Sequence, residues 1–204
     1  MVLIGMLDSP YVRRCAVSMK LMGVQFEHWP VSVFRQFDQF RAINPVVKAP
    51  SLVCDDGAVL MDSTLILDYL ESTVDPARRL MPAEVARRRE ALRITGLALV
   101  AADKCVQIVY EKEQRPGDKR HEPWLERITG QAHAAFGELE RVAHRASPWL
   151  QGERLTAADV VTACAWRFGQ FYNAPEIASA RFPALTAYSS RAEALAEFAS
   201  TPLD

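Results

Sequence analysis

The sequence predicts two domains of different class: a small α/β domain over residues 1–76 and an all-helical domain over residues 85–204, joined by a linker over residues 77–84. Strand-like segments, which are short apolar runs bounded by turn residues, occur only in about the first 75 residues. Beyond them, apolar residues recur at helical spacing. The chain of 204 residues is long enough to bury a core in each domain.

The elements of the first domain are expected in the order β-α-β-α-β-β-α. A strand over residues 2–7 ends in Asp8-Ser9-Pro10, where Ser9 suits a helix N-cap and Pro10 the first helical position. The helix that follows, over residues 11–22, ends at Gly23. The remaining elements are a strand at 26–31, a short helix within 34–43, strands at 50–54 and 58–61, and a helix over 63–71. This order is typical of a thioredoxin-like domain.

The second domain is expected to be a helical bundle. A long helix over residues 84–113 is broken by Arg115-Pro116-Gly117, and another follows over residues 122–146. Thr156 and Asp159 have the spacing of a capping box, in which each side chain bonds the other residue's backbone N–H. This box opens a helix that is apolar on most faces, and two shorter helices are expected after Pro175 and Pro183.

Composition excludes several classes of function. The 24 basic and 25 acidic residues leave a net charge of -1, which does not favour a nucleic-acid binder. The four cysteines lack the paired spacing of a metal site, so neither a metal nor a disulfide framework is expected. No apolar run reaches the ~18 residues of a membrane span, and the first residues do not read as a secretory signal, so a cytoplasmic protein is expected.

Three turns of the first domain contain candidate binding and catalytic residues: Ser9-Pro10-Tyr11, Lys48-Ala49-Pro50 and Asp62-Ser63. In a thioredoxin-like domain they lie at one edge of the sheet. The first turn would direct a helix N-terminus, with its partial positive charge and free N–H groups, at whatever lies beside Ser9. A free thiol has a pKa near 8.5, and a hydroxyl donor beside it favours the thiolate. Lowering that pKa by about two units corresponds to about 2.7 kcal/mol of stabilisation of the thiolate relative to the thiol.

The other two turns suit a peptide ligand. Ala49-Pro50 favours a cis peptide bond, which would expose the backbone of Ala49 for pairing with an extended peptide. The N–H and hydroxyl of Ser63 at a helix start suit a carboxylate, and Asp62 can accept from an ammonium group. A thiol, a peptide backbone, a carboxylate and an amine together describe a small thiol peptide.

The chain resembles the cytosolic glutathione S-transferases, in particular the bacterial and plant forms with a Ser-Pro-aromatic motif. The resemblance implies that Ser9 activates the glutathione thiol and that Ala49 binds the cysteinyl backbone beside a cis Pro50. It also implies that Asp62 and Ser63 bind the γ-glutamyl end, although the family usually carries Glu or Gln where this chain has Asp62. The matching stretches are Asp8-Ser-Pro-Tyr-Val-Arg-Arg14, Asn44-Pro-Val-Val-Lys-Ala-Pro50, Met61-Asp-Ser-Thr-Leu-Ile-Leu-Asp-Tyr-Leu70 and Leu155-Thr-Ala-Ala-Asp159.

Further expectations come from the same resemblance. Lys48 would lie near the glycyl carboxylate, the protein would form a homodimer, and the acceptor pocket would lie between the two domains. The predicted activity is transfer of glutathione to a small apolar electrophile, with glutathione as co-substrate and neither a cofactor nor a metal.

Alternatives remain open at several residues. Tyr11 is a rival to Ser9 as the activating hydroxyl, and Ser9 has the simpler reading of a helix cap. Tyr110 could line an acceptor pocket or pack in the core. Arg87-Arg88-Arg89 fits a solvated face or part of a dimer surface. The rival functions are a glutathione-dependent peroxidase or reductase, and a non-enzymatic carrier that binds glutathione. A cysteine at position 9 would have favoured mixed-disulfide chemistry, which Ser9 does not.

Overall fold

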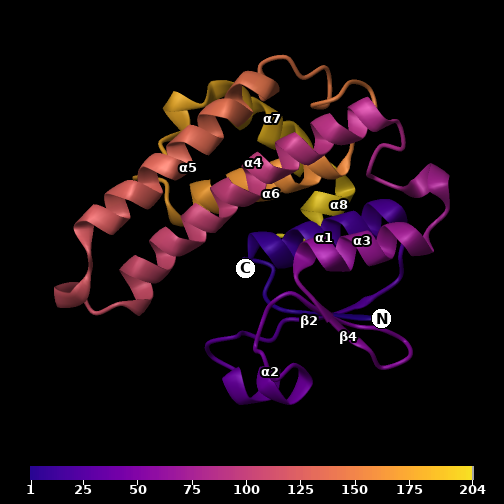
Figure 1. Cartoon of the computed structure of the whole chain (residues 1–204), viewed down its shortest axis with the longest axis horizontal. Helices are drawn as coiled ribbons and strands as arrows, with labels where there is room; N and C mark the ends of the chain where they lie inside the picture. Colours follow the sequence, from indigo (N-terminus) through magenta and orange to yellow (C-terminus); the bar gives the residue numbers. More distant parts are fainter. Residues whose placement is uncertain (204) are drawn as a thin grey trace. The chain divides into compact units, whose positions relative to one another are not determined.

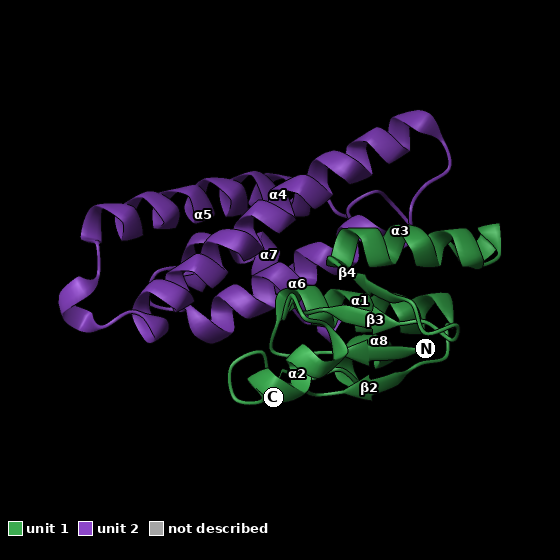
Figure 2. Cartoon of the chain, turned by 60° about the horizontal axis from the view of Figure 1, so that its bottom comes forward, with its two compact units in different colours: residues 1–80, 195–204 green, residues 81–194 purple. Residues whose placement is uncertain are grey.

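The chain folds into two compact units in a computed structural model that describes residues 1–203. The first unit comprises residues 1–80 together with the C-terminal segment from Leu195, and the second comprises residues 81–194 (Figure 2). The sequence predicts that residues 195–204 belong to the helical domain, whereas residues 195–203 group with the α/β unit in the structure. The difference arises because the segment's side chains pack on a helix of the first unit, as described below.

The first unit is built on a mixed four-stranded sheet with the strand order β2-β1-β3-β4. Strand β1 runs parallel to β2, and the helix between them supplies the crossover that a parallel pair needs. The other two pairs are antiparallel, and in their register Ile4 lies opposite Ser51 and Ser51 lies opposite Met61. The strands are β1 (Val2–Ile4), β2 (Glu27–Trp29), β3 (Ser51–Val53) and β4 (Val59–Met61).

Helices cover both faces of this sheet. Helices α1 (Pro10–Met22) and α3 (Ser63–Thr73) lie side by side on one face, and α2 (Phe37–Ile43) lies on the other (Figure 1). On the α2 side, Ile4 and Phe40 are fully buried in one cluster with Val31. The element order confirms the predicted thioredoxin-like domain, and the elements fall inside or within two residues of the predicted ranges.

Helix α1 begins and ends where the sequence predicts. Ser9 is its N-cap and Pro10 its first residue, so the missing proline N–H leaves no helical hydrogen bond unmade. Gly23 closes the helix with φ +63°, a left-handed conformation that favours glycine, and its N–H donates to the carbonyl of Lys20 at 2.9 Å.

The second unit is a bundle in which one long helix packs against two others. The predicted helix over 84–113 ends as an α-helix at Val109 and closes with a π-helical turn, Tyr110–Gln114. After Pro175 there is only a 3-10 turn, Ser179–Arg181, where the sequence predicts a helix. The described helices of this unit are α4 (Val85–Val109), α5 (Glu122–Ala143), α6 (Ala157–Tyr172) and α7 (Pro183–Glu193), and among the helices of residues 1–203 none has the length and apolarity to cross a membrane.

A buried carboxylate organises the start of α6. Asp159 is fully buried and accepts the backbone N–H of Thr156 at 2.8 Å, which completes the predicted capping box. It also accepts the N–H of Leu150 and the hydroxyl of Tyr188, each at 2.8 Å. Burial raises the pKa of Tyr188 well above its ordinary value, so its hydroxyl keeps its proton and acts as a donor. Asp159 therefore ties the 149–156 loop and α7 to α6.

Candidate functional site

The three turns singled out in the sequence meet at one edge of the sheet. Ser9 follows the end of β1, Pro50 precedes the start of β3, and Asp62 follows the end of β4. The register places Ile4, Ser51 and Met61 opposite one another, so the turns that adjoin them lie side by side. Antiparallel pairing thus converts three distant stretches of sequence into one site.

Ser9 holds a half-buried position at the start of α1. Its carbonyl accepts the N–H of Arg13 at 2.9 Å, which starts the helix. Its hydroxyl accepts the N–H of Val12 at 3.5 Å, the outer limit of a hydrogen bond, so this cap bond is weak. The oxygen can therefore also face a ligand thiol. Tyr11, also half-buried, lies in the same turn, and both hydroxyls remain candidates.

The Ala49-Pro50 peptide bond is cis, as the sequence predicts. Gly5 allows Ala49 to approach the first turn of α1: a Cβ on Gly5 would lie 3.2 Å from the Cβ of Ala49 and 2.6 Å from Cγ2 of Val12. Gly5 also has φ +135°, which disfavours any side chain. The side chain of Lys48 is exposed, and its carbonyl accepts the hydroxyl of Ser51 at 2.8 Å.

Asp62 and Ser63 form the start of α3, as its N-cap and its first residue. Asp62, at φ +69°, is the N-cap, and its Oδ1 accepts the N–H of Thr64 at 2.8 Å. Because Asp62 is exposed, its other carboxylate oxygen can still accept from a ligand ammonium group. Ser63 is buried as the first residue of the helix, where its backbone N–H has no partner within the helix.

Arg14 contacts the start of α3, which the sequence did not predict. It is 3% exposed, and its Nη1 donates to the hydroxyls of Ser63 at 3.2 Å and Thr64 at 3.3 Å. A buried guanidinium therefore lies behind the helix start that suits a carboxylate. Charged side chains of a helix usually face solvent. The structure buries Arg13 and Arg14 because α1 is covered both by α3 and by the C-terminal helix α8 (Ala196–Ala199).

Tyr110 belongs to the second unit. It opens the π-helical turn at the end of α4 and is 47% exposed. Its ring is therefore not part of the bundle core, which leaves it able to contact a ligand.

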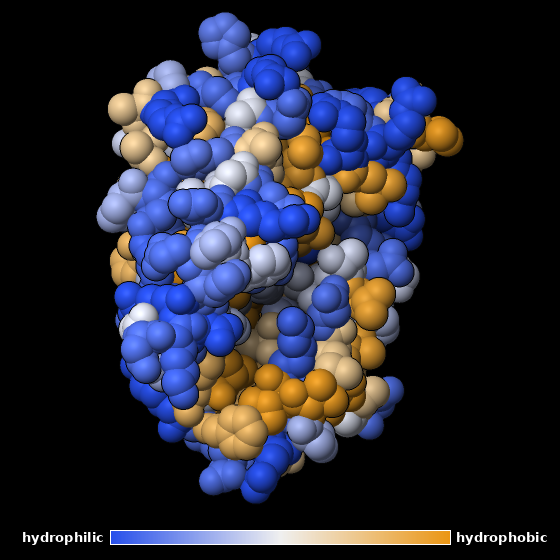
Figure 3. Space-filling model, turned by 60° about the vertical axis from the view of Figure 1, so that its left-hand side comes forward, coloured by the Kyte–Doolittle hydropathy of each residue, from blue (hydrophilic) through white to orange (hydrophobic). Residues whose placement is uncertain are grey.

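Apolar side chains are exposed on the α2 side of the first unit. Figure 3 shows such side chains gathered on the lower part of one face, at the level that α2 occupies in Figure 1. The segment around α2 exposes Phe34, Phe37 and Val46, at 53%, 48% and 64%. This segment immediately precedes Lys48-Ala49-Pro50 and supplies apolar surface beside the polar turns.

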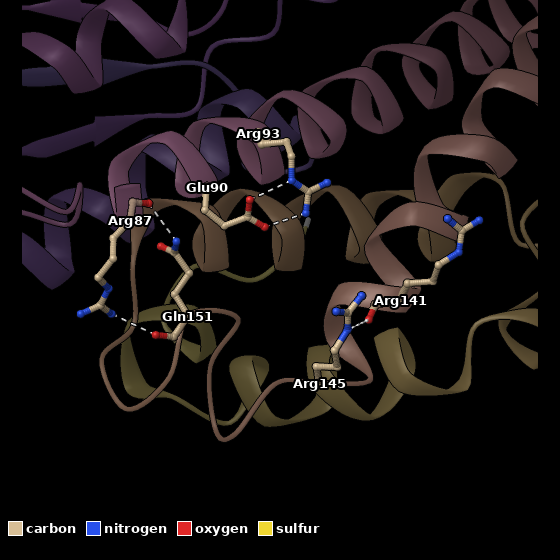
Figure 4. Close-up of polar contacts among 6 residues, drawn as sticks. All are labelled: Arg87, Glu90, Arg93, Arg141, Arg145 and Gln151. Atoms are coloured by element: carbon tan, nitrogen blue, oxygen red, sulfur yellow. Dashed lines mark hydrogen bonds and ion pairs between the residues drawn. The ribbon is translucent and has the colours of Figure 1, made fainter. Parts of the chain in front are cut away.

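The arginine-rich start of α4 is engaged in contacts within the second unit. Arg87 and Gln151 exchange hydrogen bonds between side chain and backbone, each at 2.9 Å (Figure 4). Arg93 binds both carboxylate oxygens of Glu90, at 2.9 Å and 2.7 Å. This hydrogen bond from Arg93 is the main reason that the pKa of Glu90 lies below its ordinary value. These contacts give Arg87 and Arg93 a structural role.

The cysteines lie in the interior of the protein. All four cysteines are buried and free. Burial, reinforced by Glu176, raises the pKa of Cys105 to about 12, so this thiol stays protonated at neutral pH. Within residues 1–203, no three His, Cys, Asp or Glu side chains are grouped so that they could hold a metal ion.

Comparisons with known proteins agree with this geometry. The family model of the glutathione S-transferase N-terminal domain matches residues 3–78, and that of the C-terminal domain matches residues 122–191. A maize glutathione transferase, GST 23, is 28% identical over 78% of this chain and 77% of its own. The maleylacetoacetate isomerase of Pseudomonas aeruginosa is 25% identical over 72% of this chain and 71% of its own.

Two solved structures of similar proteins contain glutathione or a derivative. A glutathione S-transferase from Methylobacterium radiotolerans in complex with glutathione sulfonate has a TM-score of 0.90 and 27% identity, over 98% of this chain and 93% of its own. A glutathione transferase family member from Pseudomonas fluorescens with bound glutathione has a TM-score of 0.86 and 26% identity, over 100% and 98%. The two domain matches and the shared fold show that the chain belongs to the glutathione S-transferase family.

Proposed function

We propose that this protein binds glutathione as the thiolate and transfers it to a small apolar electrophile. The observation that carries the proposal is the alignment of Ile4, Ser51 and Met61 in the sheet register, which gathers Ser9, Ala49-Pro50 and Ser63 at one edge. Each of the three turns suits a different part of one tripeptide. The glutathione-containing relatives support the ligand, and the maize transferase supports the reaction class.

In the proposed complex each turn makes one contact. The γ-glutamyl carboxylate accepts the Ser63 N–H, with the Arg14 charge behind it, and Asp62 accepts from the γ-glutamyl ammonium. The backbone of Ala49 pairs with the cysteinyl residue. Lys48 attracts the glycyl carboxylate as a flexible, exposed cation, a contact worth at most about 1 kcal/mol.

The chemistry requires an ionised sulfur. The thiol proton leaves to solvent, and the sulfur then accepts a hydrogen bond from Ser9 and lies near the positive end of α1. The thiolate attacks the electrophilic carbon, and a carbon–sulfur bond forms. With an aryl halide, the halide departs with the electron pair of its own bond. With an epoxide or an enone, the electron pair ends on the substrate as an alkoxide or enolate, which takes a proton from water. The protein lowers the barrier through proximity and thiolate stabilisation, and no other residue has to transfer a proton.

Calorimetry and turnover assays together test the proposal. Titration of reduced glutathione should give one site per chain with heat of binding, and a panel of aryl halides, enones and epoxides should include at least one that is converted to a glutathione conjugate detectable by mass spectrometry. Binding without any turnover would favour a carrier, and consumption of hydroperoxides without conjugates would favour a peroxidase. The absence of binding to folded protein would overturn the proposal.

A second candidate is glutathione-dependent isomerisation, because two of the similar proteins are named maleylacetoacetate isomerase or probable maleylacetoacetate isomerase. The same thiolate would add to a conjugated cis double bond, allow rotation about the resulting single bond and then leave again. Glutathione is regenerated in this reaction, whereas conjugation consumes it. Measuring glutathione consumed per maleylacetoacetate converted therefore separates the candidates: zero indicates isomerisation and one indicates conjugation.

We also propose that the protein forms a homodimer. Helix α3 exposes Leu65 at 65% and Tyr69 at 38%, which lie one turn apart on the same helix face, and Met61 just before the helix is 39% exposed. Association of two copies would remove this apolar surface from water. Light scattering should give twice the chain mass of 22.8 kDa, and Leu65→Glu should give the single-chain mass. Phe171→Glu, which alters an exposed aromatic residue of α6, is the matched control, and a monomeric parent protein would contradict the proposal.

A further inference from the structure

A pocket lies within the first unit, and no step of the proposed transfer uses it. It has a volume of about 400 Å³ and lies between the C-terminal half of α1, the connection from α1 to β2 and the end of α8. It shares no lining residue with the three turns described above, and its volume falls within the range of small-molecule sites. The walls that matter for the argument are formed by Leu7, Lys20, Val24, Phe26, His28 and Thr201.

One end of the pocket carries an ordered positive charge. Lys20 Nζ donates to the carbonyl of Ser200 at 2.9 Å and to its hydroxyl at 2.7 Å. An ammonium group has three donors, so one N–H remains for a ligand. Because Ser200 already holds the side chain in place, a ligand does not have to order it, which favours binding.

The ionisable groups of the pocket favour an anion. Of the described residues that line it, Lys20 and His28 are ionisable and none is acidic. The side chain of His28 is held in the lining by a hydrogen bond, because its Nε2 lies 2.7 Å from the carbonyl oxygen of Gly5. A carbonyl oxygen can only accept, so Nε2 is the donor. The C-terminal end of α1 carries partial negative charge, so an anionic group is expected at Lys20 and not against the carbonyl groups near Gly23.

One wall of the pocket is apolar. Leu7 is nearly buried, whereas Val24 and Phe26 are half-buried, and all three line the space beyond Lys20. A flat ring against these side chains would remove apolar surface from water on both partners. We propose that this pocket binds small aryl carboxylates, with the carboxylate on the Lys20 ammonium group and the ring against Val24 and Phe26. The site would be additional to those for glutathione and its acceptor.

The test uses the full chain with its first site saturated by S-methylglutathione. The probes are 2-naphthoate, which is anionic, and 2-naphthalenemethanol, which has the same ring and no charge. Calorimetry gives the dissociation constants, and amide chemical shifts locate the bound probe. For 2-naphthoate, Lys20→Met should raise the dissociation constant about five- to tenfold, since it removes one partly exposed charge-assisted hydrogen bond. The dissociation constant of the neutral probe should stay the same.

Three further variants complete the experiment. Lys20→Arg keeps the charge and should retain binding, and Lys119→Met, which removes an exposed lysine of the second unit, should leave binding unchanged. Val24→Trp fills the pocket and should weaken the binding of both probes. This variant keeps the proposal testable if Lys20→Met does not fold. The proposal is overturned if the shifts lie outside the pocket lining, which comprises Leu7, Ala16 and residues within 20–28 and 200–201, or if Lys20→Met folds and binds 2-naphthoate as the parent does. If Lys20→Met does not fold, the proposal is overturned if Val24→Trp folds and binds both probes as the parent does.

Discussion

At the scale of single residues, the proposed site includes a hydroxyl, that of Ser9, which makes only a weak cap bond. Because the Ser9 Oγ to Val12 N distance is 3.5 Å, the loss of this bond should cost the helix little. The same oxygen lies where a thiolate would meet the start of α1. Ser9→Ala therefore tests catalysis more than folding.

We expect Ser9→Ala to lower kcat at pH 6.5 about tenfold or more, because each unit by which the thiol pKa rises lowers the thiolate fraction about tenfold. The KM for glutathione should change less, and the rise of rate with pH should move to higher pH. Ser72→Ala, which alters an exposed serine of the same unit, is the control. An unchanged pH profile would show that Ser9 is not the activating group and would direct attention to Tyr11.

Arg14 should act through the γ-glutamyl carboxylate. Arg14→Met removes the buried charge behind Ser63, and we expect the dissociation constant of glutathione to rise about tenfold, as for the loss of an interaction with a charged group. Cysteinylglycine, which lacks the γ-glutamyl group, should bind equally to both forms. Arg14→Lys should be intermediate, and Arg35→Met provides a control at an exposed arginine. Equal weakening of both peptides would assign Arg14 to folding alone.

At the scale of elements, the capping box of α6 combines a local signal with distant contacts. Asp159→Ala should cost about 3–5 kcal/mol of unfolding free energy, because it leaves the N–H groups of Leu150 and Thr156 without their acceptor. The Tyr188 hydroxyl would keep only its 3.3 Å hydrogen bond to the backbone carbonyl of residue 159. Asp159→Asn should cost less. Urea unfolding gives these values, with Glu153→Ala as the exposed control. Activity per folded molecule should not change, and a variant as stable as the parent would refute the structural role.

The π-helical turn should contribute to acid sensitivity. The pKa of Glu111 lies below its ordinary value, mainly because its carboxylate accepts the N–H of His121 at 2.9 Å and also that of Arg115 Nε at 2.8 Å. A carboxyl group whose pKa is lower in the folded state than in the unfolded state stabilises the folded protein at pH values above the unfolded pKa. This contribution is lost as the pH falls through the folded pKa.

Glu111→Gln should therefore destabilise the protein at pH 6 and have a smaller effect near pH 3.5. Urea unfolding at both values measures the difference. Glu113→Gln, in the same turn and exposed, is the charge-matched control. A destabilisation that does not depend on pH would contradict the account.

At the scale of the whole molecule, the C-terminal segment from Leu195 packs in the first unit, although the helices of the second unit precede it in the sequence. Phe198 of α8 is fully buried, and Arg13 donates to the carbonyls of Thr201 at 2.7 Å and Phe198 at 3.3 Å. The end of the sequence therefore supports the helix that carries Ser9 at its start. Stability of the first unit should depend on residues nearly 200 positions away from that site.

Phe198→Ala tests this dependence. Truncating a buried phenylalanine usually costs about 3–5 kcal/mol, and we expect that loss in the first unit. Hydrogen exchange should show α1 less protected while the amides of α5 and α6 keep their protection. Phe171→Ala, at an exposed position of α6, is the control. Unchanged protection of α1 would show that the C-terminal segment does not support it.

Much of the fold could be predicted because its signals are local. Ser9, Pro10 and Gly23 specify the ends of α1 through backbone conformations and cap bonds within a few residues. The Thr156 and Asp159 pair does the same for α6. Of the site residues, Ala49 and Pro50 were expected at a cis peptide bond, which the structure confirms. The roles of Ser9, Tyr11, Lys48, Asp62, Ser63 and Tyr110 toward a ligand stay predictions.

Residue order alone was thus sufficient for the class of both domains and for the choice of the three turns. The burial of Arg14 against Ser63, the return of residues 195–203 to α1 and the pocket at Lys20 emerged only from packing between segments far apart in the chain. The reason is physical: caps and turns depend on neighbours within one helical turn, whereas burial of a given helix face depends on which distant element covers it.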